Sequence, residues 1–281
     1  MLRIVTDGAA DMPVGWEEEY DIQVIPINMQ FGERTYLQGV DLTNEDFYRL
    51  VEESGKIPKT SQPSPFQFKK FYESVAKAGD TILSLHVTSK LSGTFESAVT
   101  ATRELGDKFN IVPFDSGAGS AALGMMCREA RLMERTGAAS QQIIERMTRI
   151  RREVQIVLTV DKLDYARMSG RVGTLQAALA SALNVKPIIV LREGLLGVAE
   201  RVRTRRKALD RVLDILHAQF AQEEVNVAAV HARDLPSAQG MLERARKIFN
   251  CKQLILTELS IAVAANLGPG TVGLIVYPAG G

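Results

Sequence analysis

Residues 81–105 read TILSLHVTSKLSGTFESAVTATREL, and this stretch decides the fold that we expect. Thr81–Val87 is short, apolar and bounded by polar residues, which favours a buried strand. Thr94–Leu105 has the length and the spaced apolar residues of an amphipathic helix. A buried strand, a polar loop and a helix in succession are the repeating unit of a parallel sheet covered by helices.

The same alternation extends over the first half of the chain. It predicts an N-terminal α/β lobe, residues 1–152, in which helices flank a largely parallel sheet. The other strands expected here are Leu2–Val5, Val24–Ile27 and Ile111–Phe114, and the other helices are Asn44–Glu53, Pro65–Lys77, Ser120–Arg135 and Gln141–Arg152.

The pattern changes after Arg152. Strand candidates now follow one another directly, and Arg192-Glu193-Gly194 is a good hairpin turn between two of them. We therefore expect a C-terminal α+β lobe with a mixed sheet, residues 153–281. Its strands are Val154–Val160, Pro187–Leu191, Leu195–Arg203, Val225–His231, Gln253–Leu259 and Thr271–Tyr277, and its helices are Lys162–Met168, Leu175–Leu183, Lys207–Phe220 and Ala238–Phe249.

The composition narrows the class of protein. Of 281 residues, 46% are hydrophobic and 24% charged, which is the balance of a globular protein and not of a disordered one. A formal net charge of +1 gives no overall case for nucleic acid as a partner. No apolar run reaches the roughly 18 residues of a membrane span, and the N-terminus does not read as a signal peptide. These features predict a soluble cytoplasmic protein without stable membrane insertion.

The loop Thr88–Thr94 combines several hydroxyl groups with Lys90 and Gly93 at the start of a helix. Free N–H groups and the positive end of the dipole meet there, so the loop predicts the binding of an anion. Its glycine spacing excludes a P-loop, and Lys90 stands where a nucleophile elbow has glycine. Ser92 has no visible base, but both an anion cradle and a nucleophilic serine remain open.

Two other loops have ligand-binding composition. Thr60 and Ser61 precede Ser64-Pro65, which alone explains the start of a helix; the two extra hydroxyl groups favour an anion. Asp11 follows the first strand and either contacts a ligand or caps a helix.

The second half of the chain adds two candidates. Arg171 lies between glycines, where it is either a surface residue or a carboxylate or phosphate ligand. Asn266 precedes a Gly-Pro-Gly turn, which is a rigid corner and by itself says little. No histidine, cysteine or acidic residues have metal-ligand spacing, and no glycine-rich dinucleotide motif is present, so no metal or cofactor is expected.

Taken together, these segments resemble the DegV family of fatty-acid-binding proteins over nearly the whole chain. Each motif is weak alone, but six in the family's order are hard to obtain by chance. They are Thr6-Asp7-Gly8-Ala9-Ala10-Asp11-Met12-Pro13 (family Thr-Asp-Ser-Thr-Ala-Asp-Leu-Pro), Thr60-Ser61-Gln62-Pro63-Ser64, Ser89-Lys90-Leu91-Ser92-Gly93-Thr94, Asp115-Ser116, Gly170-Arg171-Val172 and Val185-Lys186-Pro187-Ile188.

The resemblance implies a long-chain fatty acid between the two lobes, presented to a separate fatty acid kinase for phospholipid synthesis. By position, Thr60 and Ser92 would hydrogen-bond the carboxylate, with Ser61 and Gly93 beside them. Arg171 would join the surrounding polar network. Asn266 stands where the family usually has histidine, and its amide can donate a hydrogen bond but cannot carry a proton.

The resemblance also requires an apolar tunnel. Leu175–Val185 is a candidate wall, although it also reads as an ordinary core helix. The expected protein is thus a carrier without catalysis of its own. The rivals are a hydrolase or phosphotransferase that uses Ser92, and a binding or regulatory protein that senses a lipid or another anionic metabolite.

Overall fold

The computed structural model describes residues 1–161, 164–169 and 185–280. The chain divides into two compact units. The first comprises Met1–Arg151 together with Ser260–Ala262, and the second comprises Arg152–Leu259 and Val263–Gly281. The short segment Ser260–Ala262 thus belongs to the first unit, although the sequence on both sides of it belongs to the second.

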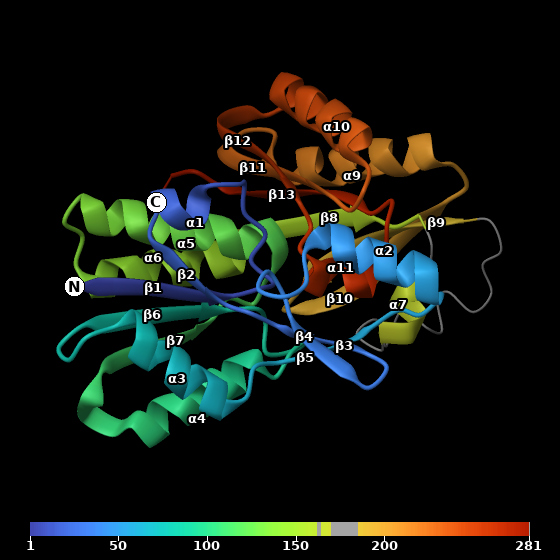
Figure 1. The fold of residues 1–281 in the computed structure, drawn as a ribbon. Helices are drawn as coiled ribbons and strands as arrows, with labels where there is room; N and C mark the ends of the chain where they lie inside the picture. The colour runs from blue at the N-terminus through green and yellow to red at the C-terminus, as the bar shows by residue number, and fades with distance from the viewer. Residues whose placement is uncertain (162–163, 170–184, 281) are drawn as a thin grey trace. The chain divides into compact units, whose positions relative to one another are not determined.

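A four-stranded sheet with strand order β2-β1-β6-β7 forms the centre of the first unit. All of these pairings are parallel, which confirms the largely parallel sheet expected for the N-terminal half. The loops after the strands therefore leave the sheet at one edge (Figure 1). The strands are β1 (Leu2–Asp7), β2 (Ile22–Ile25), β6 (Thr81–His86) and β7 (Asn110–Asp115).

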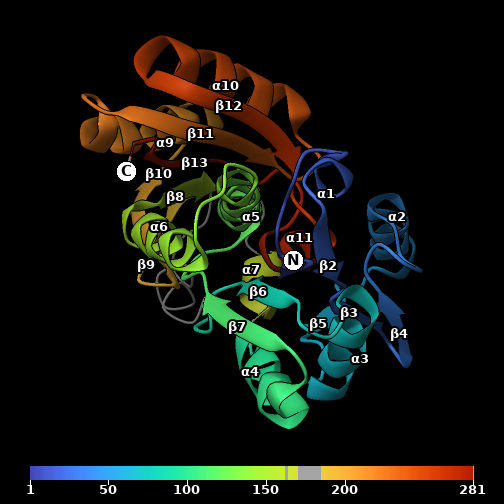
Figure 2. The same cartoon turned by 90° about the vertical axis from the view of Figure 1, so that its left-hand side faces the viewer.

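Helices cover both faces of this sheet, with α3 and α4 on one side and α5 and α6 on the other (Figure 1, Figure 2). Phe68 and Tyr72 of α3 and Ala98 of α4 pack with Val5 and Ile82 of the sheet in one buried cluster. The described helices of this half are α1 (Trp16–Glu19), α2 (Asn44–Ser54), α3 (Pro65–Val75), α4 (Thr94–Leu105), α5 (Ser120–Arg135) and α6 (Ser140–Glu153), with a 3₁₀ turn at Gly106–Lys108.

A second, antiparallel sheet of the first unit has the order β4-β3-β5. Its strands are β3 (Asn28–Phe31), β4 (Arg34–Leu37) and β5 (Lys59–Ser61). These three strands were not predicted from the sequence, and the prediction of a loop at residues 59–61 was wrong. Strands of three or four residues that are partly exposed give too weak an alternation to stand out from a loop.

The second unit contains a six-stranded sheet with the order β10-β9-β8-β13-β11-β12. Strands β11 and β12 pair in parallel, and the other pairings between its described strands are antiparallel. This confirms the mixed sheet. The strands are β8 (Gln155–Thr159), β9 (Lys186–Arg192), β10 (Leu195–Val202), β11 (Glu224–His231), β12 (Asn250–Glu258) and β13 (Val272–Pro278).

The predicted hairpin joins β9 to β10 through Glu193 and Gly194. Arg192 pairs directly with Leu195, and the two turn residues have φ values of 51° and 80°. A two-residue turn with both φ angles positive matches the twist of the strands, so this prediction is confirmed.

Two long helices of the second unit pack on its sheet. They are α9 (Arg205–Phe220) and α10 (Leu235–Ile248). Val212 and Leu216 of α9 and Met241 of α10 share a buried cluster with Val227 of β11 and Leu274 of β13. The expected helix Leu175–Leu183 lies outside the described residues, whereas the helix Ile261–Leu267 was not expected. The described helices are α7 (Asp164–Ser169), α9 (Arg205–Phe220), α10 (Leu235–Ile248) and α11 (Ile261–Leu267). Within the described part of the chain, no helix combines the length and apolarity needed to cross a membrane.

Gly124 in α5 marks a close approach between this helix and the loop after β1. A Cβ atom at Gly124 would overlap the carbonyl oxygen of Asp11 and lie 2.6 Å from Cγ of Met12. Because a backbone carbonyl cannot move aside cheaply, we expect Gly124→Ala to lower the free energy of unfolding by about 1–3 kcal/mol, measured by urea denaturation.

Gly240 in α10 provides the matched control, since no atom lies within 4 Å of the Cβ position there. We expect Gly240→Ala to raise the free energy of unfolding by about 0.5–1 kcal/mol, as in any exposed helix interior. If both substitutions stabilised the protein, the close approach at Gly124 would be refuted.

Candidate functional site

The loop after β6 carries Ser92 and is anchored on the neighbouring loop after β7. The backbone N–H of Thr88 donates to the carbonyl of Ala118 over 2.8 Å. The Ser89 hydroxyl donates to Asp115 Oδ2 over 2.6 Å. Beyond this anchor, Ser92 Oγ lies 2.8 Å from Thr94 Oγ1 and is half-buried. The loop therefore holds the Ser92 hydroxyl at the start of α4.

Thr60 and Ser61 lie in β5, immediately before α3. Thr60 is half-buried and pairs with Met29 of β3, whereas Ser61 is exposed. The amide of Asn28 donates to the carbonyl of Gln62 over 3.0 Å and thereby fixes the end of the segment. The Ser64 hydroxyl then accepts from the N–H of Gln67, and so it caps α3 as the sequence predicts.

The structure brings these two segments together. A Cβ atom at Gly93 would lie 2.9 Å from Nε2 and 3.2 Å from Cδ of Gln62, so the Gln62 side chain packs directly over Gly93. Glycine is thus the residue that permits this approach. This role of Gln62 was not predicted, because a single sequence carries no signal for a contact between residues 31 positions apart.

Each of the two segments also leads directly into the N-terminal end of a helix, which carries partial positive charge. Helices α3 and α4 pack alongside one another (Figure 1, Figure 2). Since Gln62 lies just before α3 and Gly93 just before α4, both N-terminal ends face the same region. The positive ends of the two helix dipoles therefore favour an anion between the two segments.

The loop after β1 approaches the same edge of the sheet. The amide of Gln38 donates to the carbonyl of Gly8 over 2.8 Å. A Cβ atom at Gly8 would lie 2.8 Å from Cδ of Gln38, so the glutamine occupies the space that a side chain at position 8 would need. Gly8 and Gln38 are therefore a matched pair in this chain.

Asp11 is buried, with 2% of its surface exposed, and is not a helix cap. Its carboxylate accepts hydrogen bonds from the Ser120 hydroxyl and, over 2.8 Å, from the backbone N–H of Ser260. Burial raises the pKa of Asp11 to about 6, and these two hydrogen bonds oppose the rise. Asp11 therefore anchors the segment Ser260–Ala262 to the first unit, a role that the sequence did not reveal.

The remaining predicted ligand residues belong to the second half of the chain. Arg171 lies outside the described residues, as do positions 175–184 of the expected tunnel wall. Asn266 is half-buried in the last turn of α11. Gly268 and Gly270, which follow it, have φ values of 83° and 78°, so the Gly-Pro-Gly turn needs both glycines.

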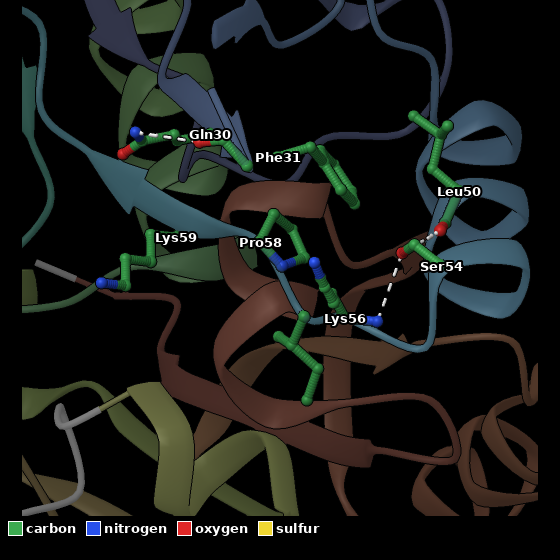
Figure 3. A pocket seen from close by; sticks show the side chains of 9 residues that line it. Gln30, Phe31, Leu50, Ser54, Lys56, Pro58 and Lys59 are labelled. Atoms are coloured by element: carbon green, nitrogen blue, oxygen red, sulfur yellow. Dashed lines mark hydrogen bonds between the residues drawn. The ribbon is translucent and has the colours of Figure 1, made fainter. Parts of the chain in front are cut away.

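A separate groove of about 450 Å³ lies in the first unit (Figure 3). Its sides are mainly apolar, and neither Thr60 nor Ser92 lines it. Figure 3 shows Phe31 and Pro58 facing Leu50 and Ser54 of α2 across this groove. It is therefore distinct from the region where the two hydroxyl-bearing segments meet.

The described residues hold no cluster of three or more histidine, cysteine or acidic side chains placed to bind a metal ion. The two cysteines are free; Cys127 is buried in α5, and Cys251 is partly exposed in β12. His86 is completely buried in β6 and pairs with Asp7, whereas His231 ends β11. The site described above is thus built from hydroxyl, amide and backbone groups.

Comparison with known proteins connects this geometry to a family. A fatty acid-binding protein of Thermotoga maritima is 30% identical, with 97% of this chain and 96% of that protein covered. The structure of a fatty-acid-binding DegV protein from Thermus thermophilus matches with a TM-score of 0.90 at 28% identity, over 99% of both chains. A stearic acid-binding protein from Eubacterium ventriosum matches with a TM-score of 0.91 at 26% identity, over 99% of this chain and 98% of that one.

The family model described as DegV, uncharacterised protein, matches residues 1–279. The match extends over both units and includes the segments that hold Thr60 and Ser92. The agreement of sequence and fold over the whole chain leads to one conclusion: this chain belongs to the DegV family.

Proposed function

We propose that this protein binds a long-chain fatty acid and holds its carboxylate with Thr60 and Ser92. The observation that carries the proposal is the packing of Gln62 over Gly93, which places the two hydroxyl-bearing segments next to each other. Relatives with nearly the same fold over the full chain are fatty-acid-binding proteins, which supports the same ligand class here.

The chemistry of the segments suits a carboxylate. The Ser92 hydroxyl donates one hydrogen bond, and its neighbour Thr94 can hold it in orientation, since their oxygens are 2.8 Å apart. The starts of α3 and α4 add partial positive charge without a metal or an ammonium group. Ser61 and Gly93 shape the same region. We include Arg171 and Asn266 as further polar contacts of the ligand.

The acyl tail and the carboxylate of the ligand contribute differently to the binding free energy. A C16 tail buries on the order of 14 methylenes at roughly 0.8 kcal/mol each, a gross gain of about 11 kcal/mol before the costs of association. A hydrogen bond to a charged carboxylate contributes about 1.5–3 kcal/mol. The tail therefore sets most of the affinity, and the hydroxyl groups select an acid over other amphiphiles. That the tail lies between the two lobes stays a prediction of the resemblance.

The surroundings of Ser92 favour a carrier over an enzyme. In the described part of the chain its hydroxyl is hydrogen-bonded to Thr94, not to an imidazole or a carboxylate that could act as a base. The resemblance to the family also implies presentation of the bound acid to a separate fatty acid kinase, and we extend the proposal to this step. Asn266 bears on this step, because an amide can orient a carboxylate but cannot take up a proton.

Native mass spectrometry of freshly purified protein tests the binding proposal. We expect a bound mass that matches a fatty acid, and we expect delipidated protein to take up palmitate or oleate with a 1:1 ratio. Protein that carries no lipid and also fails to bind both added acids would refute the proposal. Hydrolysis of acyl esters that disappears in Ser92→Ala would instead favour the hydrolase.

A further inference from the structure

Four buried side chains form a continuous hydrogen-bonded chain through the core of the first unit. Tyr72 Oη lies 2.8 Å from Ser84 Oγ, and Ser84 Oγ lies 2.7 Å from His86 Nε2. The other ring nitrogen, Nδ1 of His86, lies 3.0 Å from Asp7 Oδ2. All four residues have 0% of their surface exposed. Such a chain is costly to bury unless every member is hydrogen-bonded, and here every member is.

The Asp7 carboxylate, at one end of the hydrogen-bonded chain, determines which group donates in each of the other hydrogen bonds. The Asp7 carboxylate also accepts from the backbone N–H groups of Ala9 and Val87, over 2.9 and 3.0 Å. An ionised carboxylate only accepts, so His86 Nδ1 carries the proton. In a neutral ring Nε2 then accepts from Ser84, and Ser84 accepts from Tyr72. Burial raises the pKa of Tyr72, which keeps its phenol protonated as the donor that this order requires.

Ser84, His86 and Asp7 follow the order of a catalytic Ser-His-Asp triad. However, all three side chains are fully buried, and Ser84 is also hydrogen-bonded by Tyr72. No substrate can reach such a serine, so this arrangement requires a role other than nucleophilic catalysis.

Each end of the hydrogen-bonded chain lies in, or is bonded to, an element that leads to a segment of the site. Tyr72 belongs to α3, whose first residue follows directly on Thr60–Ser64. Phe68, one turn earlier in α3, packs edge-to-face on His86 with 5.1 Å between ring centroids. At the other end, Asp7 holds the first residue after β6, Val87, and the first turn after β1 through Ala9. The four side chains therefore connect the helix behind Thr60 to the loop that leads to Ser92.

We propose that Asp7, His86, Ser84 and Tyr72 are positioning residues that hold the Thr60 and Ser92 segments at the spacing a carboxylate needs. This inference rests on the proposed function for its ligand. It assigns the selectivity for an acid head group to an internal hydrogen-bonded chain that touches no ligand itself. A core held by apolar packing alone would allow α3 and β6 to slide by fractions of an ångström, whereas a directional chain sets one spacing.

Ser84→Ala breaks the chain in its middle and removes only one oxygen atom. We expect its affinity for palmitate to fall about tenfold, while its affinity for hexadecanol, which has the same tail and no charge, stays within about twofold. In ligand-free protein, amide hydrogen exchange of residues 87–93 and 59–62 should become faster, and exchange in α10 should not change. Ser84→Thr retains the hydroxyl group and should restore both properties.

Two outcomes would overturn the inference. One is a Ser84→Ala protein with the wild-type ratio of palmitate to hexadecanol affinity and wild-type exchange. The other is an equal loss of affinity for both ligands, which indicates a purely structural role. If Ser84→Ala does not fold, Tyr72→Phe is judged by the same criteria. If wild-type protein binds neither ligand, the proposed function fails. Amide hydrogen exchange of residues 87–93 and 59–62 in Ser84→Ala then decides alone: faster exchange supports the positioning role, and unchanged exchange overturns it.

Discussion

Replacing Ser92 by alanine is expected to weaken palmitate binding by about 10- to 100-fold. The Ser92 hydroxyl lies at the start of α4, beside the segment that carries Thr60, and Thr94 orients it. Loss of one hydrogen bond to a charged carboxylate costs about 1.5–3 kcal/mol, which corresponds to this range. Isothermal titration of delipidated protein with palmitate measures the effect. Because the tail is untouched, measurable binding should remain.

Thr100→Ala is the matched control for this variant. Thr100 lies in α4, the helix that follows Ser92, and its exposed hydroxyl donates to the carbonyl of Glu96 in the same helix. We expect wild-type affinity for palmitate in Thr100→Ala. Equal affinities of Ser92→Ala, Thr100→Ala and wild-type protein would remove Ser92 from the head-group site, while leaving fatty acid binding itself intact.

Asp11→Asn is expected to change how the stability of the protein depends on pH. In the folded protein the pKa of Asp11 is about 6, against an ordinary value of 3.8. Between these values the folded state binds more protons than the unfolded state, so the free energy of unfolding falls as the pH rises. Above pH 6 the loss reaches about 3 kcal/mol, from about two pKa units at 1.36 kcal/mol each. Asparagine does not titrate and can still accept from Ser260, so it avoids this loss.

Urea denaturation of both proteins at pH 4 and pH 7.5 measures the effect. The free energy of unfolding of Asp11→Asn relative to wild type should rise by up to about 3 kcal/mol between the two pH values. Asp80→Asn provides a contrast, because hydrogen bonds from Lys77, the N-terminal amine and Arg3 lower the pKa of Asp80 to about 2. The carboxylate of Asp80 gains its stabilising effect between about pH 2 and pH 3.8, so the stability of Asp80→Asn relative to wild type should stay nearly constant between pH 4 and pH 7.5. If the difference in free energy of unfolding between Asp11→Asn and wild type does not vary with pH, the raised pKa of the buried Asp11 carboxylate is contradicted.

The sequence predicted a helix, a strand or a turn well wherever the residues that stabilise the element lie within the element itself. Residues 81–105 contain a buried strand and a complete amphipathic helix, and the helix of the structure has the predicted bounds, Thr94–Leu105. Ser64-Pro65 predicted a helix start, and the capping box with Gln67 confirms it. Glu193-Gly194 predicted a two-residue hairpin from turn chemistry alone. In each case the physical cause lies within a few residues of the effect.

Signals that depend on distant parts of the chain were missing. Strands β3, β4 and β5 have three or four residues each, and their stability comes from pairing with one another. Asp11 read equally well as a cap or as a ligand contact, because its partners Ser120 and Ser260 lie 109 and 249 positions away. The hydrogen-bonded neighbours of His86 lie 79 and 2 positions away, at Asp7 and Ser84, and their connection became visible only in the folded unit.

By itself, the sequence determined the parallel sheet of the first half, the mixed sheet of the second, and the hydroxyl-bearing segments that contain Thr60 and Ser92. These follow from hydrophobic period, turn residues and motif order, which are local properties. Only the tertiary structure decided that Gln62 packs on Gly93, that Gln38 fills the space beside Gly8, and that a buried hydrogen-bonded chain runs from Tyr72 to Asp7. Such contacts depend on how strands and helices pack, and packing is set by the whole buried core at once.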